Sequence, residues 1–137
     1  MAHSKKQIAT FLGPNQGLVT LGEHCYAYSG SFAASTTSTT RLHFTTGKYY
    51  IVGDIRLAGM IDLATPANGR IATMTVKFNS SIVLVDKTDA AEEDMPSANV
   101  SPLIIPPLTV IEVISDANDT DVNYIGSISF TGRVYDA

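Results

Sequence analysis

The side chains that most often perform chemistry in proteins are sparse in this chain. Of its 137 residues, three are histidines and one is a cysteine: His3, His24, His43 and Cys25. The histidines share no spacing typical of a metal site, and a lone histidine in a strand is more often structural than a ligand. The sequence therefore predicts no metal site.

A nucleophilic cysteine would need a base beside it. His24 directly precedes Cys25 in HCYAY, a segment with the composition of a strand. Since successive side chains of a strand point to opposite faces, these two side chains would not meet. We expect Cys25 to be a small, buried, apolar residue.

The carboxylates and glycines form no recognisable site either. Asp116, Asn118 and Thr120 alternate as in a calcium loop, but Ser127 stands where the closing carboxylate would be. Glu112 is a single carboxylate among aliphatic residues, which is a poor basis for acid–base catalysis. The ten glycines are scattered, and no nucleophile elbow or phosphate-binding loop occurs. We therefore predict that the protein is not an enzyme and has no catalytic, cofactor-binding or metal-ligating residue.

Strand-forming residues make up much of the chain instead. Its length suits one domain with a hydrophobic core. Hydrophobic residues account for 45% and charged residues for only 16%, and serine and threonine together number 27. Such a mixture favours strands and turns over helices. The single cysteine excludes a disulfide within the chain.

The charge balance bears on the class of partner. The net charge of −4 argues against nucleic acid as the main partner. Residues 1–85 carry seven basic and three acidic side chains, whereas residues 86–137 carry two basic and ten acidic ones. This asymmetry either steers one face onto a partner or reflects acidic loops that favour solubility. No apolar run has the length of a membrane helix or of a secretory leader, so we expect no membrane partner.

Turn residues separate about eight apolar segments that have the composition of strands. These segments cover residues 24–35, 40–46, 48–62, 70–78, 82–86, 103–105, 108–115 and 123–136. Their number and the lack of helical periodicity predict an all-β, single-domain, jelly-roll-like β-sandwich of about eight antiparallel strands over residues 24–137. The strict alternation of 70–78 and its short connection to 82–86 predict a hairpin.

Prolines and one glycine refine this prediction. Pro102, Pro106 and Pro107 cannot donate to a ladder, so we expect 103–105 at a sheet edge, a kink at the two adjacent prolines, and 108–115 in an inner strand. Gly53 lies within a long strand segment whose buried face we expect to change around it, at a bulge or a twist.

The first 23 residues differ from the rest. IATFL and GLVTLG are short apolar pieces separated by the turn cluster GPNQG, and they show no lasting period. We predict that residues 1–23 form an extended N-terminal arm that becomes ordered against another surface. Its candidate contact residues are all apolar: Ile8, Phe11, Leu12, Leu18, Val19 and Leu21.

Three segments carry a resemblance to a known class of proteins. They are YSGSFAASTTSTTRLHFTTGKYYIVGDIRL, LIIPPLTVIEV and SISFTGRVY. In texture and order of elements, residues 26–135 resemble the small all-β head proteins of tailed bacteriophages. These are decoration or cement proteins that sit on the capsid shell as single jelly rolls, often as trimers.

The resemblance implies a role as well as a fold. It implies a virion structural protein, made in the host cytoplasm and located on the capsid surface. The implied partners are the major capsid protein and further copies of the chain in a homotrimer, with neither nucleic acid nor membrane involved. The N-terminal arm would then contact the shell.

Two other functions stay open. A carbohydrate- or receptor-binding sandwich of a phage fibre or spike would use exposed aromatic rings, and all six tyrosines lie in predicted strands, where they alternate as core or interface rings do. A small cupin-like enzyme would require a histidine-rich cluster around one cavity.

Overall fold

The structure is a computed structural model that describes residues 9–11, 18–62, 71–89, 98–118 and 120–135. Within these ranges the chain forms eleven strands and no helix. The strands are β1 (Ala9–Phe11), β2 (Val19–Leu21), β3 (His24–Tyr28), β4 (Phe32–Ala34), β5 (Thr39–Thr46), β6 (Tyr50–Asp62), β7 (Ile71–Phe78), β8 (Ser81–Asp89), β9 (Ala98–Ile105), β10 (Val110–Ala117) and β11 (Asp121–Tyr135). The all-β prediction is confirmed.

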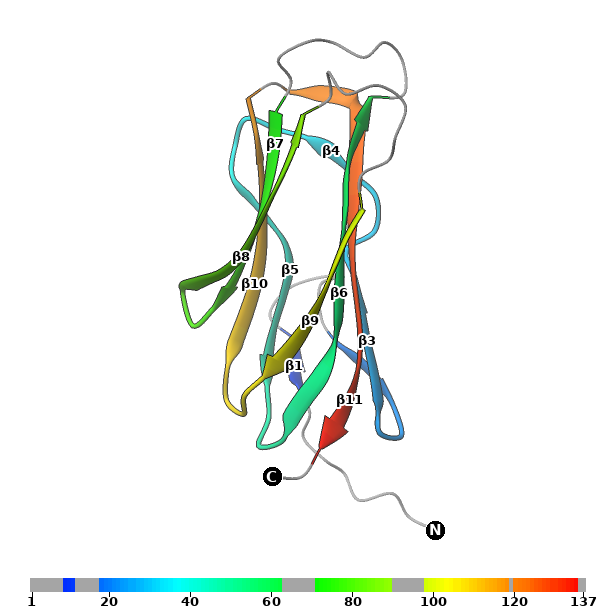
Figure 1. The fold of residues 1–137 in the computed structure, drawn as a ribbon, viewed down its shortest axis with the longest axis vertical. Coiled ribbons are helices and arrows are strands. Elements are labelled where there is room, and N and C mark those ends of the chain that lie inside the picture. The colour runs from blue at the N-terminus through cyan, green and yellow to red at the C-terminus, as the bar shows by residue number, and fades with distance from the viewer. Residues whose placement is uncertain (1–8, 12–17, 63–70, 90–97, 119, 136–137) are drawn as a thin grey trace.

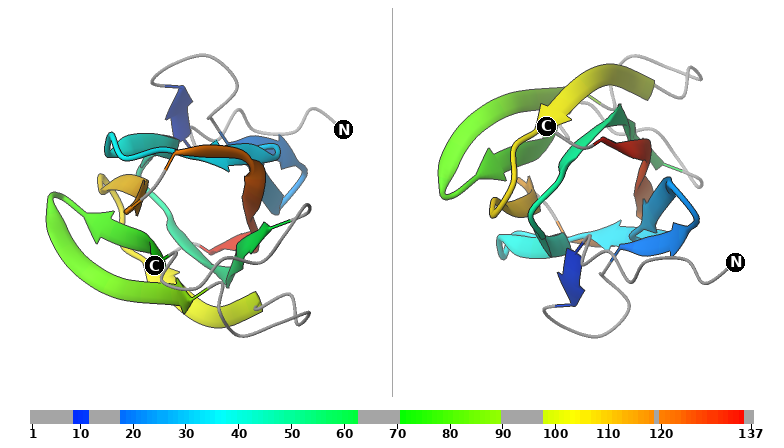
Figure 2. Two further views of the ribbon diagram at one scale, coloured as in Figure 1. Left: turned by 90° about the horizontal axis from the view of Figure 1, so that it is seen from above. Right: turned by 90° about the horizontal axis from the view of Figure 1, so that it is seen from below.

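The strands form two antiparallel sheets that lie against each other (Figure 1). Sheet A has the order β1-β5-β10-β7-β8, and sheet B has the order β2-β3-β11-β6-β9 with β4 also paired to β11. Seen along the long axis, the strands surround a central space that buried side chains fill (Figure 2).

Eight of the strands pair in a nested order. β3 pairs with β11, β5 with β10, β6 with β9, and β7 with β8, so that successive pairs lie alternately in sheets B and A. This order is that of a long hairpin folded over on itself, which is the topology of a jelly roll. The predicted jelly-roll-like sandwich is therefore confirmed, with β1, β2 and β4 as short additions.

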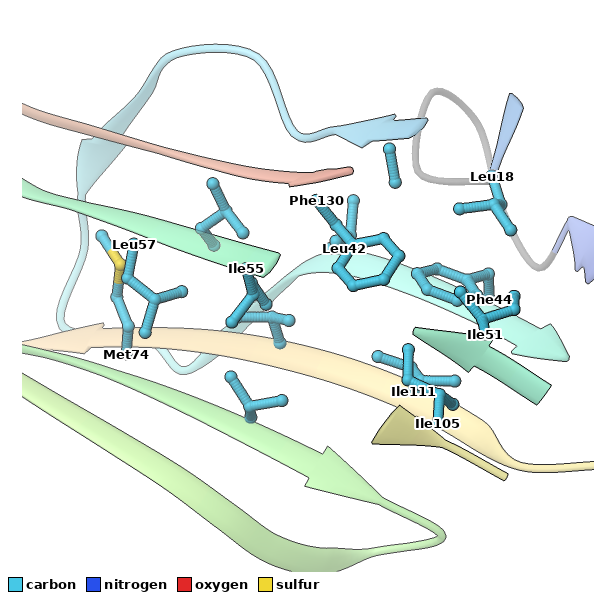
Figure 3. Close-up of a cluster of buried hydrophobic side chains, with 14 of the residues drawn as sticks. Leu18, Leu42, Phe44, Ile51, Ile55, Leu57, Met74, Ile105, Ile111 and Phe130 are labelled. Carbon is cyan, nitrogen blue, oxygen red and sulfur yellow. The ribbon is translucent and has the colours of Figure 1, made fainter. Parts of the chain in front are cut away.

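The core lies between the inner faces of the two sheets. The aromatic rings of Phe44 in sheet A and Phe130 in sheet B have centroids 6.2 Å apart (Figure 3). Around them pack aliphatic side chains from both layers: Leu42, Ile51, Ile55, Leu57, Val76, Ile105, Ile111, Val113 and Ile128. Each such side chain contributes about 1.5 to 3 kcal/mol by leaving water. Alternation along each strand supplies this inner face, because every second residue is buried.

The hairpin and the proline segment agree with the predictions. β7 and β8 are joined by Asn79 and Ser80, which have φ angles of 49° and 69°, as a two-residue hairpin turn requires. β9 is an edge strand on which Pro102 is exposed, and β10 lies between β5 and β7. A proline on the edge strand has no N–H to offer to another strand.

Gly53 corrects a prediction. We expected a bulge or a change of face there, but the pairing of β6 with β11 is unbroken at Gly53, which lies opposite Gly132. The buried face of β6 also continues through it, with Ile51 and Ile55 inward and Val52 outward. A Cβ atom at Gly53 would lie 2.1 Å from the backbone oxygen of Thr131, so the two strands approach too closely for any side chain.

The turn after β9 is held by buried threonines. The hydroxyl of Thr46 donates to the carbonyl of Pro106 at 2.8 Å and accepts from the backbone N–H of Thr109 at 2.9 Å. Thr46 is 2% exposed and Thr109 is 3% exposed. Because a proline carbonyl has no ladder partner in this turn, the Thr46 hydroxyl supplies one. It thereby fixes the point where the chain crosses from sheet B to sheet A.

The structure describes residues 9–11 and 18–23 of the predicted N-terminal arm. β1 pairs with β5 and β2 pairs with β3, so both extend a sheet edge. Leu18 is 6% exposed and belongs to the core, which corrects its prediction as a partner contact, because its side chain is covered within the chain itself. Val19 is exposed. Phe11 and Leu21 are placed by strand pairing alone, and Ile8 and Leu12 lie outside the described residues.

Replacing Thr46 by valine is expected to lower the free energy of unfolding by about 1 to 3 kcal/mol, because the buried N–H of Thr109 and the part-buried carbonyl of Pro106 lose their partner. The matched control is Thr45→Val, one residue away on the outer face, with an expected change within about 0.5 kcal/mol. Urea unfolding followed by circular dichroism measures both. Equal stability of the two variants would contradict the role given to the Thr46 hydroxyl.

Candidate interaction surface

The structure separates the residues that could form a catalytic pair. Cys25 is 3% exposed in the core, whereas the adjacent His24 is exposed on the outer face of sheet B. Burial raises the pKa of the Cys25 thiol to about 11, although a hydrogen bond with the backbone of Gly132 acts in the opposite direction. A thiol that stays protonated is a poor nucleophile. The prediction that Cys25 is a small buried residue is confirmed.

The remaining polar candidates take part in local structure. Asn118 accepts a hydrogen bond from the backbone N–H of Ile71 at 2.9 Å, and Thr120 accepts one from the N–H of Thr36 at 3.1 Å. Glu112 accepts from the hydroxyl of Thr40 at 3.3 Å. In the part of the chain that the structure describes, no three histidine, cysteine or acidic residues gather as metal ligands would.

Arg41 is a half-buried cation. Its Nε donates to the hydroxyl of Ser115 at 2.8 Å, and a second guanidinium nitrogen donates to the carbonyl of Ala33 at 3.1 Å. The guanidinium lies 4.3 Å from the ring centroid of Phe32, and its partial burial lowers its pKa. These contacts connect β5 with β4 and β10, so Arg41 acts as a brace between the sheets.

Large apolar side chains gather on the outside of sheet B. Eight of them have exposed fractions between 37% for Tyr50 and 64% for Ile104. We call this surface the tyrosine face, and its apolar members are Val19, Tyr26, Tyr28, Tyr50, Val52, Val100, Ile104 and Tyr135. They are outward-pointing residues of β2, β3, β6, β9 and β11 that alternate with core residues. Scattered apolar residues are normal on the surface of a monomer, but eight large ones on one face of a sheet mark a candidate contact surface.

The register of sheet B orders the tyrosine face in rows. One row takes a residue from each of β2, β3, β11, β6 and β9: Val19, Tyr26, Thr131, Asp54 and Pro102. The next row takes residues from β3, β11, β6 and β9: Tyr28, Ser129, Arg56 and Val100. A third, on the other side of the first, contains His24, Arg133, Val52 and Ile104. The result is an extended surface.

The sequence is compatible with tyrosine rings either in the core or at an interface, and the structure places several of them on this surface. Tyr26 and Tyr28 lie side by side on β3, with ring centroids 6.4 Å apart. The residues between and beside them, Cys25 and Ala27, are buried. In HCYAY the small residues therefore face the core and the large rings face outward. That contrast in size within one alternating segment is a signal by which the tyrosine face could have been predicted.

Charged side chains are interspersed with the rings, and they balance. Asp54 and Arg56 are exposed on β6, two residues apart and on the same face. Arg133 on β11 forms an ion pair with Glu23 at 3.6 Å. Two acidic and two basic groups thus accompany the apolar residues, and the face carries no net charge apart from His24. Such a surface does not strongly repel a partner surface of either positive or negative charge.

A second apolar patch lies on β8, the edge strand of sheet A. Ile82, Val83 and Val85 are 45% to 62% exposed. We call these three residues the β8 patch. Figure 1 shows the tip of the β7–β8 hairpin standing away from the body of the sandwich. The patch and the tyrosine face belong to different sheets, so one molecule offers two separate apolar surfaces.

No protein-family model and no curated protein matches the chain. Among the described residues, no helix is long and apolar enough to cross a membrane.

The raised pKa of Cys25 leads to a pH-dependent stability. The thiol ionises near pH 9 in the unfolded chain and near pH 11 in the folded one, so the folded state binds the proton more tightly and its stability falls as the pH rises through this window. A tenfold difference in proton affinity is worth about 1.4 kcal/mol. Wild type should therefore lose on the order of 2 to 3 kcal/mol more than Cys25→Ala between pH 8.5 and 11. Urea unfolding at several pH values measures this, and parallel pH profiles would contradict it.

Proposed function

We propose that this chain is a virion structural protein of a tailed bacteriophage, a decoration or cement protein that binds the capsid shell and its own copies. One observation carries the proposal: a jelly roll presents apolar side chains on two separate surfaces, the tyrosine face and the β8 patch. A protein that bridges neighbours needs two contact surfaces rather than a pocket. The resemblance of residues 26–135 to such head proteins supports the same assignment.

The two surfaces suit different tasks in this role. The tyrosine face is broad and charge-balanced, which suits tight packing against another folded surface. The β8 patch lies on an edge strand that belongs to the projecting β7–β8 hairpin, where backbone groups and β-branched side chains can add to a neighbouring sheet. We assign the β8 patch, together with the N-terminal segment that contains Ile8, to the major capsid protein. Repetition over many copies would multiply a modest contact into firm attachment.

Binding to shells tests this function. The full chain should co-sediment with empty capsids of the phage that encodes it, at a saturable ratio. Ile82→Lys combined with Val85→Lys should weaken binding by roughly ten-fold or more, because each lysine replaces apolar contact area with a hydrated charge. Removal of residues 1–8 should weaken it as well.

The control for this experiment is Lys87→Ala, an exposed change on the same strand that leaves the three apolar residues in place. Thermal melting checks that all variants fold. Failure of the full chain to bind shells would contradict the function, whereas unchanged binding of the variants would contradict only the assignment to the β8 patch.

The exposed rings favour a second candidate function, the binding of carbohydrate or of a receptor glycan. Tyr26 and Tyr28 offer two neighbouring ring faces to solvent, and sugars pack on such faces. If this is the function, Tyr26→Ala should abolish glycan binding on an array, while Tyr26→Phe should retain most of it because the ring remains. An array without hits for the wild type would dismiss this candidate.

A further inference from the structure

We propose that the tyrosine face is the contact between two copies of this chain, which stack face to face about a two-fold axis that crosses β6 at the level of Ile55. This inference deepens the proposed function, because it names the partner of one of the two surfaces. It commits to a dimer, in place of the homotrimer that the resemblance implies.

The charges at the centre of the face carry the argument. β6 is an inner strand of sheet B, and Asp54 and Arg56 lie on it with β11 on one side and β9 on the other. The two residues are two apart on one strand, so they point the same way and are separated by about 6.6 Å along it. Among the described residues, neither has an ion-pair partner within the chain.

A two-fold axis between these charges makes the face complementary to itself. The axis lies between the two facing sheets and runs perpendicular to the strands, so β6 of the second copy runs antiparallel to β6 of the first. Asp54 of each copy then lies opposite Arg56 of the other, and two equivalent ion pairs form. Packed sheets lie about 10 Å apart, a gap that an aspartate and an arginine from facing strands can span together. An isologous contact of this kind closes on itself and forms no chain of copies.

The same axis brings the neighbouring residues into favourable positions. The row that contains Tyr26 faces the row that contains Tyr28 in the second copy, so the tyrosines of β3 meet in two equivalent aromatic pairs. On β6 the bulky Val52 faces the small Ala58 of the second copy, since both are three residues from the axis. Large side chains thus oppose small ones, and rings oppose rings, as close packing of two surfaces requires.

The size of the face is adequate for such a contact. β6 and β11 extend over the levels of positions 50 to 58 of β6, β9 over the levels of 51 to 58, β3 over the levels of 52 to 56, and β2 over three residues. With a strand spacing of about 4.8 Å and a rise of about 3.3 Å per residue, these segments give a flat projection of roughly 500 Å². A pleated face with upright side chains has a larger accessible area than its projection, and stable interfaces bury about 800 Å² per partner. The apolar rings supply the affinity, while the central ion pairs set the register.

Charge reversal tests the register directly on the purified full chain, without any shell. Light scattering coupled to size-exclusion chromatography and sedimentation velocity over a concentration series should show a dimer for the wild type. Asp54→Arg places arginine opposite Arg56 of the second copy, and Arg56→Asp places aspartate opposite Asp54. Each single change should raise the dissociation constant of the dimer roughly ten-fold or more. The combined D54R/R56D exchange restores opposite charges across the axis and should return the dimer to near wild-type strength.

Asp116→Arg is the matched control, since it makes the same charge change at an exposed position of β10 in sheet A and should leave the dimer intact. Circular dichroism verifies that every variant folds. A wild type that stays monomeric or forms a trimer overturns the inference, and so does a dimer that the single reversals leave unchanged. Failure of the D54R/R56D exchange to recover association overturns the two-fold register. Because shells are absent, none of these results depends on whether the chain binds a capsid.

Discussion

The pairing of β6 with β11 in the middle of sheet B is the constraint on which the rest of the structure depends. Its register places Ile55 and Phe130 in the core and Asp54 and Thr131 outside. A slip by one residue would exchange these two sets and expose the core. Gly53 and Gly132 face each other at a point where the strands approach too closely for side chains, so the glycine pair favours this register and, with it, the composition of the tyrosine face.

Much of the architecture could be predicted because it follows from local patterns. The alternation of residues 71–78 and the short turn after Phe78 predicted the β7–β8 hairpin. The prolines that flank LII predicted the edge strand β9 and the inner strand β10. Both features are encoded within a few neighbouring residues, through the pleat of a strand and the missing N–H of proline, so no knowledge of distant contacts was needed.

Features that depend on distant contacts were missed. The sequence predicts a change of face at Gly53, and the structure shows none, because the glycine accommodates the close approach of Gly132, which lies far along the chain. The role of Thr46 depends on Pro106, which lies 60 residues further along the chain. The burial of Leu18 depends on core residues that come mostly from strands after residue 23. The tyrosine face could not be predicted as a unit either, because it combines eight residues from five strands whose order only the nested topology reveals.

The nested pairing also sets the order in which the molecule can be assembled from a linear chain. The β7–β8 hairpin closes a loop of two residues and can form as soon as both strands exist, whereas β3 must wait for β11, which follows it by about a hundred residues. Closing such a long loop costs entropy before any contact offsets it. Folding should therefore advance outward from the middle of the sequence and finish at its two ends, slowly for a chain of this length. During synthesis on the ribosome, half of sheet B stays without its central strand until translation has nearly finished.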